Sequence, residues 1–219
     1  LRDFAEQENK KHIITTRIEH KAVLEPIEHL EKNGFEVSYL EVDESGIVDA
    51  KNLAKLLRED TLLVSIMHVN NETGSIQPVT EICNALQFHD AYLHIDAAQS
   101  FGKLSDDLNN DRIDLISASG HKVYAPKGIG ALIIRKRGFL RTPLKPIMFG
   151  GGQEKSLRPG TLAVPLIAGF GLACEIVVKN KQTWQAHAQG LKDALINELD
   201  KLNVVYNGEN TSPFVLNFS

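Results

Sequence analysis

The sequence predicts an α/β fold, a three-layer α/β/α sandwich in which helices cover both faces of a mostly parallel sheet. Short apolar runs of strand length alternate with helical stretches along most of the chain, which is the pattern of βαβ units. The runs are nearly continuous in apolar residues, as expected for strands that are covered on both faces. The 219 residues, of which 42% are apolar, suffice for one large domain and part of a second one.

The predicted elements follow one another in a βαβα order. Strands are expected at residues 12–16, 36–42, 61–69, 91–95, 114–118 and 130–136, each an apolar run bounded by polar turns. Helices are expected at residues 19–33, 49–59 and 78–89. Gly34 is a suitable stop for the first helix and Asp49 a suitable N-cap for the second, while Pro26 predicts a kink or a shortened first turn.

The remainder of the chain predicts two long helices, at 165–179 and 183–202, followed by strand-like segments at 203–206 and 214–218. We therefore expect a large domain at residues 1–170, incomplete at its N-terminus. Residues 171–219 would hold the long helices and the start of a small α+β domain. The first residues read as the end of an amphipathic helix, with no initiator Met and no signal peptide, so we expect a piece of a longer cytoplasmic protein.

Composition excludes several classes of function. The net charge of −4 comes without a basic run, which argues against a nucleic-acid or membrane-surface partner. No segment approaches the roughly 20 apolar residues of a membrane helix. Cys83 and Cys174 lie in helix-like apolar patterns and are expected to be buried, reduced thiols. The scattered histidines predict no metal site.

Polar residues follow four of the apolar runs, at the carboxyl ends of the predicted strands. Open α/β sheets bind their ligands at these ends. These residues are at positions 17–20, 68–74, 96–100 and 119–122. Asp96, directly after a buried strand, is suited to pair with a protonated pyridine nitrogen, although an ordinary helix N-cap explains it equally well. The sequence thus predicts one pocket built from several strand ends.

Lys122 and His20 extend this hypothesis. A lysine in a desolvated pocket can form a Schiff base with an aldehyde, and Ser119 and His121 beside Lys122 can donate to a phosphate. An isolated lysine would more simply be exposed, but this one follows a buried strand and precedes a Pro/Gly loop. His20 can lie flat on an aromatic cofactor and move a proton, or it can be a surface residue of the first helical turn.

Eight segments in order carry a family resemblance: residues 19–23, 46–49, 64–74, 94–100, 119–122, 126–130, 150–154 and 158–162. Among them are Met-His-Val-Asn-Asn-Glu-Thr-Gly at 67–74, Ser-Gly-His-Lys at 119–122 and Arg-Pro-Gly-Thr-Leu at 158–162. The set resembles the NifS-type cysteine desulfurases, class V aminotransferase-like enzymes of fold type I that use pyridoxal 5'-phosphate (PLP). No metal is implied. This chain would be the central portion of such an enzyme.

The resemblance implies a role for each candidate residue. Lys122 would bind PLP covalently, and His20 would stack on the ring and take part in catalysis. Asp96 would bind the pyridine nitrogen, and Gln99 would bind the ring hydroxyl oxygen. Ser119 and His121 would bind the phosphate, and Asn71 would lie near the ring and the substrate. Thr161 would reach the phosphate of the neighbouring subunit's PLP, so a homodimer is implied.

The resemblance also implies the reaction, in which sulfur is removed from L-cysteine to give L-alanine and an enzyme persulfide. The sulfur would pass to an acceptor or scaffold protein, for iron–sulfur cluster assembly or tRNA thiolation. The family's cysteine loop matches neither Cys83 nor Cys174, so we expect this chain alone to be inactive. Pro159 stands where the family often has Ser, and it removes a backbone donor. Alternatives are another class V enzyme (a selenocysteine lyase or an aminotransferase) or a non-catalytic, truncated scaffold.

Overall fold

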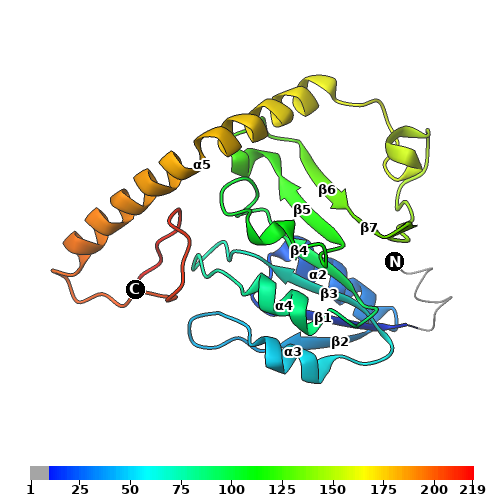
Figure 1. Cartoon of the computed structure of the whole chain (residues 1–219), viewed down its shortest axis with the longest axis horizontal. Helices are drawn as coiled ribbons and strands as arrows, with labels where there is room; N and C mark the ends of the chain where they lie inside the picture. The colour runs from blue at the N-terminus through cyan, green and yellow to red at the C-terminus, as the bar shows by residue number, and fades with distance from the viewer. Residues whose placement is uncertain (1–9) are drawn as a thin grey trace.

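The computed structural model describes residues 10–219, and its centre is a six-stranded sheet with the strand order β2-β1-β3-β4-β5-β6. The first five strands run parallel, and β6 is antiparallel to β5 (Figure 1). The strands are β1 (His12–Thr16), β2 (Glu36–Leu40), β3 (Thr61–Met67), β4 (Tyr92–Asp96), β5 (Leu115–Ser119) and β6 (Gly130–Ile134). The mostly parallel α/β fold predicted from the sequence is therefore confirmed.

Helices cover both faces of this sheet. Helix α2 (Lys21–Lys32) lies on one face, and α3 (Ala50–Leu56) and α4 (Val79–Ala85) lie on the other (Figure 1). Alternate strand residues supply the two apolar layers. Those facing α3 and α4 include Ile14, Val64, Ile66, Leu93 and Ile95, and those facing α2 include Ile13 and Leu63. All seven are buried, so the sheet is the core of the molecule.

The predicted helix starts agree with the structure better than the predicted ends. Asp49 caps α3, because its Oδ1 accepts a hydrogen bond from the Lys51 N–H at 2.8 Å. Helices α3 and α4 are both shorter than predicted, ending at Leu56 and Ala85. Pro26 lies inside α2, which continues through it.

Helix α5 (Val164–Leu199) is one element of 36 residues, where the sequence predicted two helices. The residues between the two predicted helices contain neither Gly nor Pro, so no local signal ends the helix there. Asn180 at this point bonds back to the Ile176 carbonyl at 2.8 Å, as residues four apart on a helix can. Lys181 forms an ion pair of 2.6 Å with Asp106, which ties the middle of α5 to the loop after β4.

The chain after α5 forms isolated bridges instead of the two predicted strands. Val205 and Ser219 exchange hydrogen bonds of 2.8 and 2.9 Å, and Thr211 bridges to Ser75 in the loop after β3. Smaller elements complete the described chain: η1 (Asp107–Asn109), η2 (Gly120–Val123), β7 (Lys136–Arg137), β8 (Leu140–Arg141) and η3 (Gln153–Ser156). No helix within residues 10–219 is long and apolar enough to cross a lipid bilayer.

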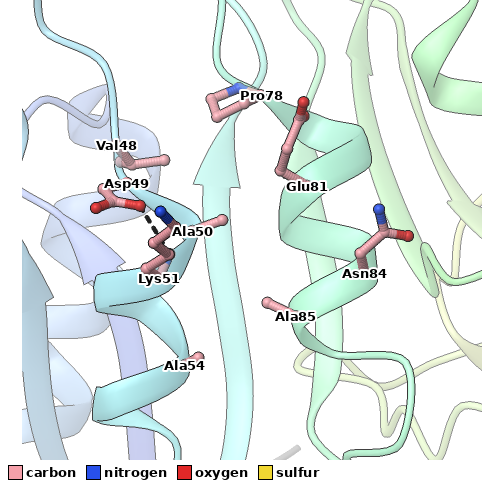
Figure 2. A pocket seen from close by; sticks show the side chains of 9 residues that line it. All are labelled: Val48, Asp49, Ala50, Lys51, Ala54, Pro78, Glu81, Asn84 and Ala85. Atoms are coloured by element: carbon pink, nitrogen blue, oxygen red, sulfur yellow. Dashed lines mark hydrogen bonds between the residues drawn. The ribbon is translucent and has the colours of Figure 1, made fainter.

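A groove of about 480 Å³ opens between α3 and α4 (Figure 2). Its walls come from the two helices and the turns before them, and include Asp49, Lys51, Pro78 and Glu81. None of the eight residues proposed from the sequence to bind a cofactor lines it. The groove is therefore separate from the candidate site, which is described from the strand ends below.

Candidate cofactor site

The carboxyl ends of β3, β4 and β5 lie side by side in register. Met67 pairs with Asp96, and Asp96 pairs with Ser117, two residues before the end of β5. This pairing places Asp96 between the loop that begins at His68 and the turn that begins at Ser119. Three of the four polar segments predicted from the sequence thus start from adjacent strands, and β1 brings the fourth next to β3.

Asp96 is the last residue of β4 and is buried, with 8% of its surface exposed. Its Oδ1 accepts a hydrogen bond of 2.9 Å from the Ala98 N–H, which closes the turn leading to Gln99. Its other oxygen accepts no hydrogen bond from residues 10–219. The local capping role and a role in binding a cation are therefore compatible, because each uses a different oxygen. Gln99 is half-buried in the same turn.

His94, two residues before Asp96, holds this part of the sheet together. Its Nδ1 lies 2.8 Å from Ser65 Oγ on β3, and its Nε2 lies 2.7 Å from Ser117 Oγ on β5. Burial lowers the pKa of His94, which favours the neutral ring between the two hydroxyls. His94 is thus a structural residue, and it braces the strand that carries Asp96.

Lys122 lies in η2, the short turn that leaves the end of β5. Ser119 Oγ and His121 Nδ1 are 3.0 Å apart, so these two candidate phosphate ligands are adjacent. Lys122 is half-buried. The turn is held against the start of β6 by the Gly120 N–H, which donates to the Ile129 carbonyl at 2.9 Å. The register of β5 and β6 therefore sets where Lys122 lies.

Lys103 is a second lysine near Lys122 that the sequence analysis did not single out. Burial lowers the pKa of Lys103, and the charge of Lys122 lowers it further. Its Nζ lies 5.1 Å from the ring centres of both Tyr124 and Phe214, a distance suited to cation–π contacts. The glycine–lysine pair at 102–103, directly after a strand-end motif, was the available signal.

His20 is the exposed N-cap of α2, and its Nδ1 accepts a hydrogen bond of 3.1 Å from the Ala22 N–H. Because Nδ1 is an acceptor, the neutral ring carries its proton on Nε2. The loop after β3 approaches the same place, since Asn70 Nδ2 donates to the Ile18 carbonyl at 3.1 Å. Asn71, the predicted ligand, is half-buried next to Asn70 and donates to Glu72 Oε1 at 2.7 Å.

Thr161 is not brought to this group by the described contacts. It is exposed in the loop before α5 and forms no hydrogen bond to the other candidates within residues 10–219. The preceding Gly160 has a φ of 107°, and its N–H donates to Gln153 Oε1 at 3.1 Å, which shapes the loop. The expected contact with a neighbouring subunit remains a proposal.

The donor set fits PLP. A buried carboxylate with a free oxygen suits a protonated ring nitrogen, a half-buried lysine on the next strand end suits the aldehyde, and paired hydroxyl and imidazole groups suit the phosphate. Within residues 10–219 no group of three or more His, Cys, Asp or Glu side chains is placed to hold a metal ion. The arrangement fits a class of protein, the α/β proteins that hold PLP at the carboxyl ends of their strands.

The comparison with family models agrees. Residues 2–219 match the aminotransferase class-V family, and the chain belongs to this family, whose members are PLP-dependent. The "Cysteine desulfurase, mitochondrial" of Saccharomyces cerevisiae is 51% identical over 193 residues, 88% of this chain and 38% of the yeast protein. "Cysteine desulfurase IscS" of Klebsiella pneumoniae is 45% identical over 216 residues, 97% of this chain and 53% of that relative.

Solved structures show the same fold. DndA from Streptomyces lividans superposes with a TM-score of 0.97 at 50% identity, over 100% of this chain and 62% of DndA. "SspA in complex with cysteine" superposes with a TM-score of 0.82 at 41% identity, over 99% of this chain and 60% of SspA. The chain spans about half the length of the curated relatives it matches.

Proposed function

We propose that the full-length protein is a cysteine desulfurase, which uses PLP to remove sulfur from L-cysteine and gives L-alanine and a persulfide on a protein cysteine. The observation that carries the proposal is the match of nearly the whole chain to relatives named cysteine desulfurase, together with Asp96 and Lys122 at adjacent strand ends. When bound, PLP withdraws electrons from the α-carbon of the substrate.

Each proposed ligand has a task set by its chemistry. Lys122 would bind the aldehyde, and Asp96 would offer its free oxygen to the ring nitrogen, which would keep that nitrogen protonated. His20 would stack on the ring, and its Nε2 proton would be available for transfer to the substrate. The remaining proposed contacts are those of Gln99 with the ring hydroxyl oxygen, of Ser119 and His121 with the phosphate, of Asn71 with ring and substrate, and of Thr161 with the phosphate of a neighbouring subunit's PLP.

We also propose a homodimer, a cytoplasmic location and an acceptor or iron–sulfur scaffold protein as sulfur partner. Support for a dimer comes from large apolar side chains that are exposed on one stretch, Phe139, Ile147 and Phe149, and on α5, Leu172 and Ile176. Single exposed apolar residues are common, but runs of them mark interaction surfaces. Under the domain division proposed above, the first three residues belong to the large domain, and Leu172 and Ile176 belong to the part that follows residue 170.

The test compares cofactor binding by the full-length protein and two lysine variants. PLP added to the unmodified protein should produce the visible absorption band of cofactor bound covalently to a lysine. Lys122→Ala should abolish this band. Lys127→Ala is the matched control, because Lys127 is an exposed lysine five residues further on, and it should keep the band. A band that persists in Lys122→Ala would contradict the assignment.

The reaction is tested by product analysis with L-cysteine and a reductant. Alanine and sulfide formed in equal amounts would support desulfurase activity. Release of selenium from selenocysteine without sulfide from cysteine would instead identify a selenocysteine lyase, and amino transfer to a keto acid would identify an aminotransferase. Either of these two results would refute the proposed reaction.

A further inference from the structure

Glu19 is a buried carboxylic acid that the proposed function leaves without a role. It directly precedes His20 at the start of α2, yet its side chain turns into the protein and is 5% exposed. Its Oε1 accepts a hydrogen bond of 2.7 Å from the Met67 N–H and one of 3.0 Å from Thr16 Oγ1. One carboxyl oxygen therefore joins the ends of β1 and β3 next to the proposed site.

The second oxygen of Glu19 has a different environment. Oε2 is buried and has no hydrogen-bond partner in the described part of the chain. A carboxylate oxygen without a donor is costly to bury, and the charge of Asp96 nearby opposes ionisation further. Burial is the largest cause, and it raises the pKa of Glu19 to about 8 against the opposing bonds from Met67 and Thr16.

The hydrogen bonds also indicate where the proton of the acid lies. Oε1 already accepts from two donors, which is the role of the carbonyl oxygen in a neutral carboxyl group. The proton then belongs on Oε2, the oxygen that receives no donor. In this form Glu19 can hold Met67 and Thr16 without bringing a second negative charge beside Asp96. Two adjacent buried carboxylates do not both ionise readily.

We propose that Glu19 is a positioning residue that works as the neutral acid, tying the turn of His20 to the end of β3 while leaving Asp96 as the anion for the cofactor ring nitrogen. The inference rests on the proposed function in assigning PLP to Asp96. Its protonation and hydrogen bonding are properties of this chain that can be measured without cofactor.

The test uses the full-length protein with and without PLP. The apoprotein is labelled with ¹³C at glutamate side-chain carboxyls, and the resonance missing from Glu19→Gln identifies Glu19. This carboxyl should titrate with a pKa near 8, as burial predicts. Glu25→Gln, on the exposed side of α2, is the matched control and should leave the Glu19 resonance and its titration unchanged.

PLP affinity provides the second measurement. Glu19→Gln keeps a neutral acceptor and should bind PLP within about 2-fold of the unmodified protein. Glu19→Met removes the acceptor at similar length, and leaving Met67 N–H unpaired should weaken PLP binding roughly 10-fold. If Glu19→Met does not fold, the titration and the Glu19→Gln comparison still decide the question.

Two results would overturn the inference: titration of Glu19 in the apoprotein near the value of a solvent-exposed carboxyl, or a loss of PLP affinity of roughly 10-fold in Glu19→Gln. In either case the cofactor band that depends on Lys122 would persist, so the proposed function would stand. If the cofactor band did not depend on Lys122, the proposed function would fail. The proposed role of Glu19 would then fail with it.

Discussion

Substituting Gly120 by Ala tests whether close backbone packing positions Lys122. A Cβ at Gly120 would lie 2.7 Å from the Ile129 carbonyl oxygen and 2.7 Å from Ile129 Cγ2. The side-chain carbon could rotate away, but the carbonyl oxygen cannot, because it accepts the Gly120 N–H at 2.9 Å. The turn η2 must therefore move away from β6, and Lys122 must move with it.

The cost follows from two opposing effects. Forcing an extra methyl into a closely packed place costs about 1–3 kcal/mol, and a weakened backbone hydrogen bond costs about 1 kcal/mol. Replacing Gly by Ala recovers about 0.4–1 kcal/mol by restricting the unfolded chain. We expect Gly120→Ala to lose roughly 2 kcal/mol of folding free energy, together with much of the PLP absorption band.

Thermal unfolding and PLP absorbance of the full-length protein would measure both effects. Gly171→Ala is the matched control, since Gly171 lies within α5 and a Cβ there would meet no atom within 4 Å. This control should gain about 0.5–1 kcal/mol, because Ala favours a helix interior over Gly. If Gly120→Ala unfolds like the unmodified protein and keeps its band, the packing argument is refuted.

Three further predictions concern buried groups. Asp114 is 2% exposed and pairs with Arg112 at 3.0 Å and Arg137 at 2.6 Å, so Asp114→Ala should cost about 3–5 kcal/mol in chemical denaturation; a loss below about 1 kcal/mol would contradict this. Burial raises the pKa of Cys83 to about 11, so native protein should protect this thiol from iodoacetamide near neutral pH, and alkylation as fast as in denatured protein would disprove it. The pKa of Glu19 rises on folding from 4.5 to about 8, so ionisation destabilises the native state as pH increases between these values. Relative to Glu19→Gln, the unmodified protein should lose about 3 kcal/mol between about pH 5 and pH 7.5, and a pH-independent difference would exclude the raised pKa.

The fold class was predictable because the evidence for it is local. A continuous apolar run such as 61–69 and the helical pattern that follows it specify their own conformations within a few residues. Helix ends were less predictable: α3 stops at Leu56 because Leu57 is extended, although the residues that follow would permit further helix. Helix α5 is continuous where two helices were predicted, because residues 180–182 contain no Gly or Pro that would end it.

The candidate site was predictable to the extent that its residues directly follow strands. Asp96 and Lys122 are conspicuous in sequence because a charged residue after a buried strand needs an explanation. Lys103 and Glu19 were missed, because their environments come from residues that are far away in the sequence, such as Phe214 beside Lys103. Glu19 owes its environment to Met67, 48 residues further along the chain.

Local sequence was therefore sufficient for the α/β architecture, the choice of strands and the polar residues at their ends, since these depend on periodicity over a few positions. Long-range packing was needed for the order of the strands, the approach of Gly120 to Ile129 and the burial of Glu19. Burial and charge depend on segments that are distant in sequence and meet only in the folded chain, so a pattern of neighbouring residues cannot specify them.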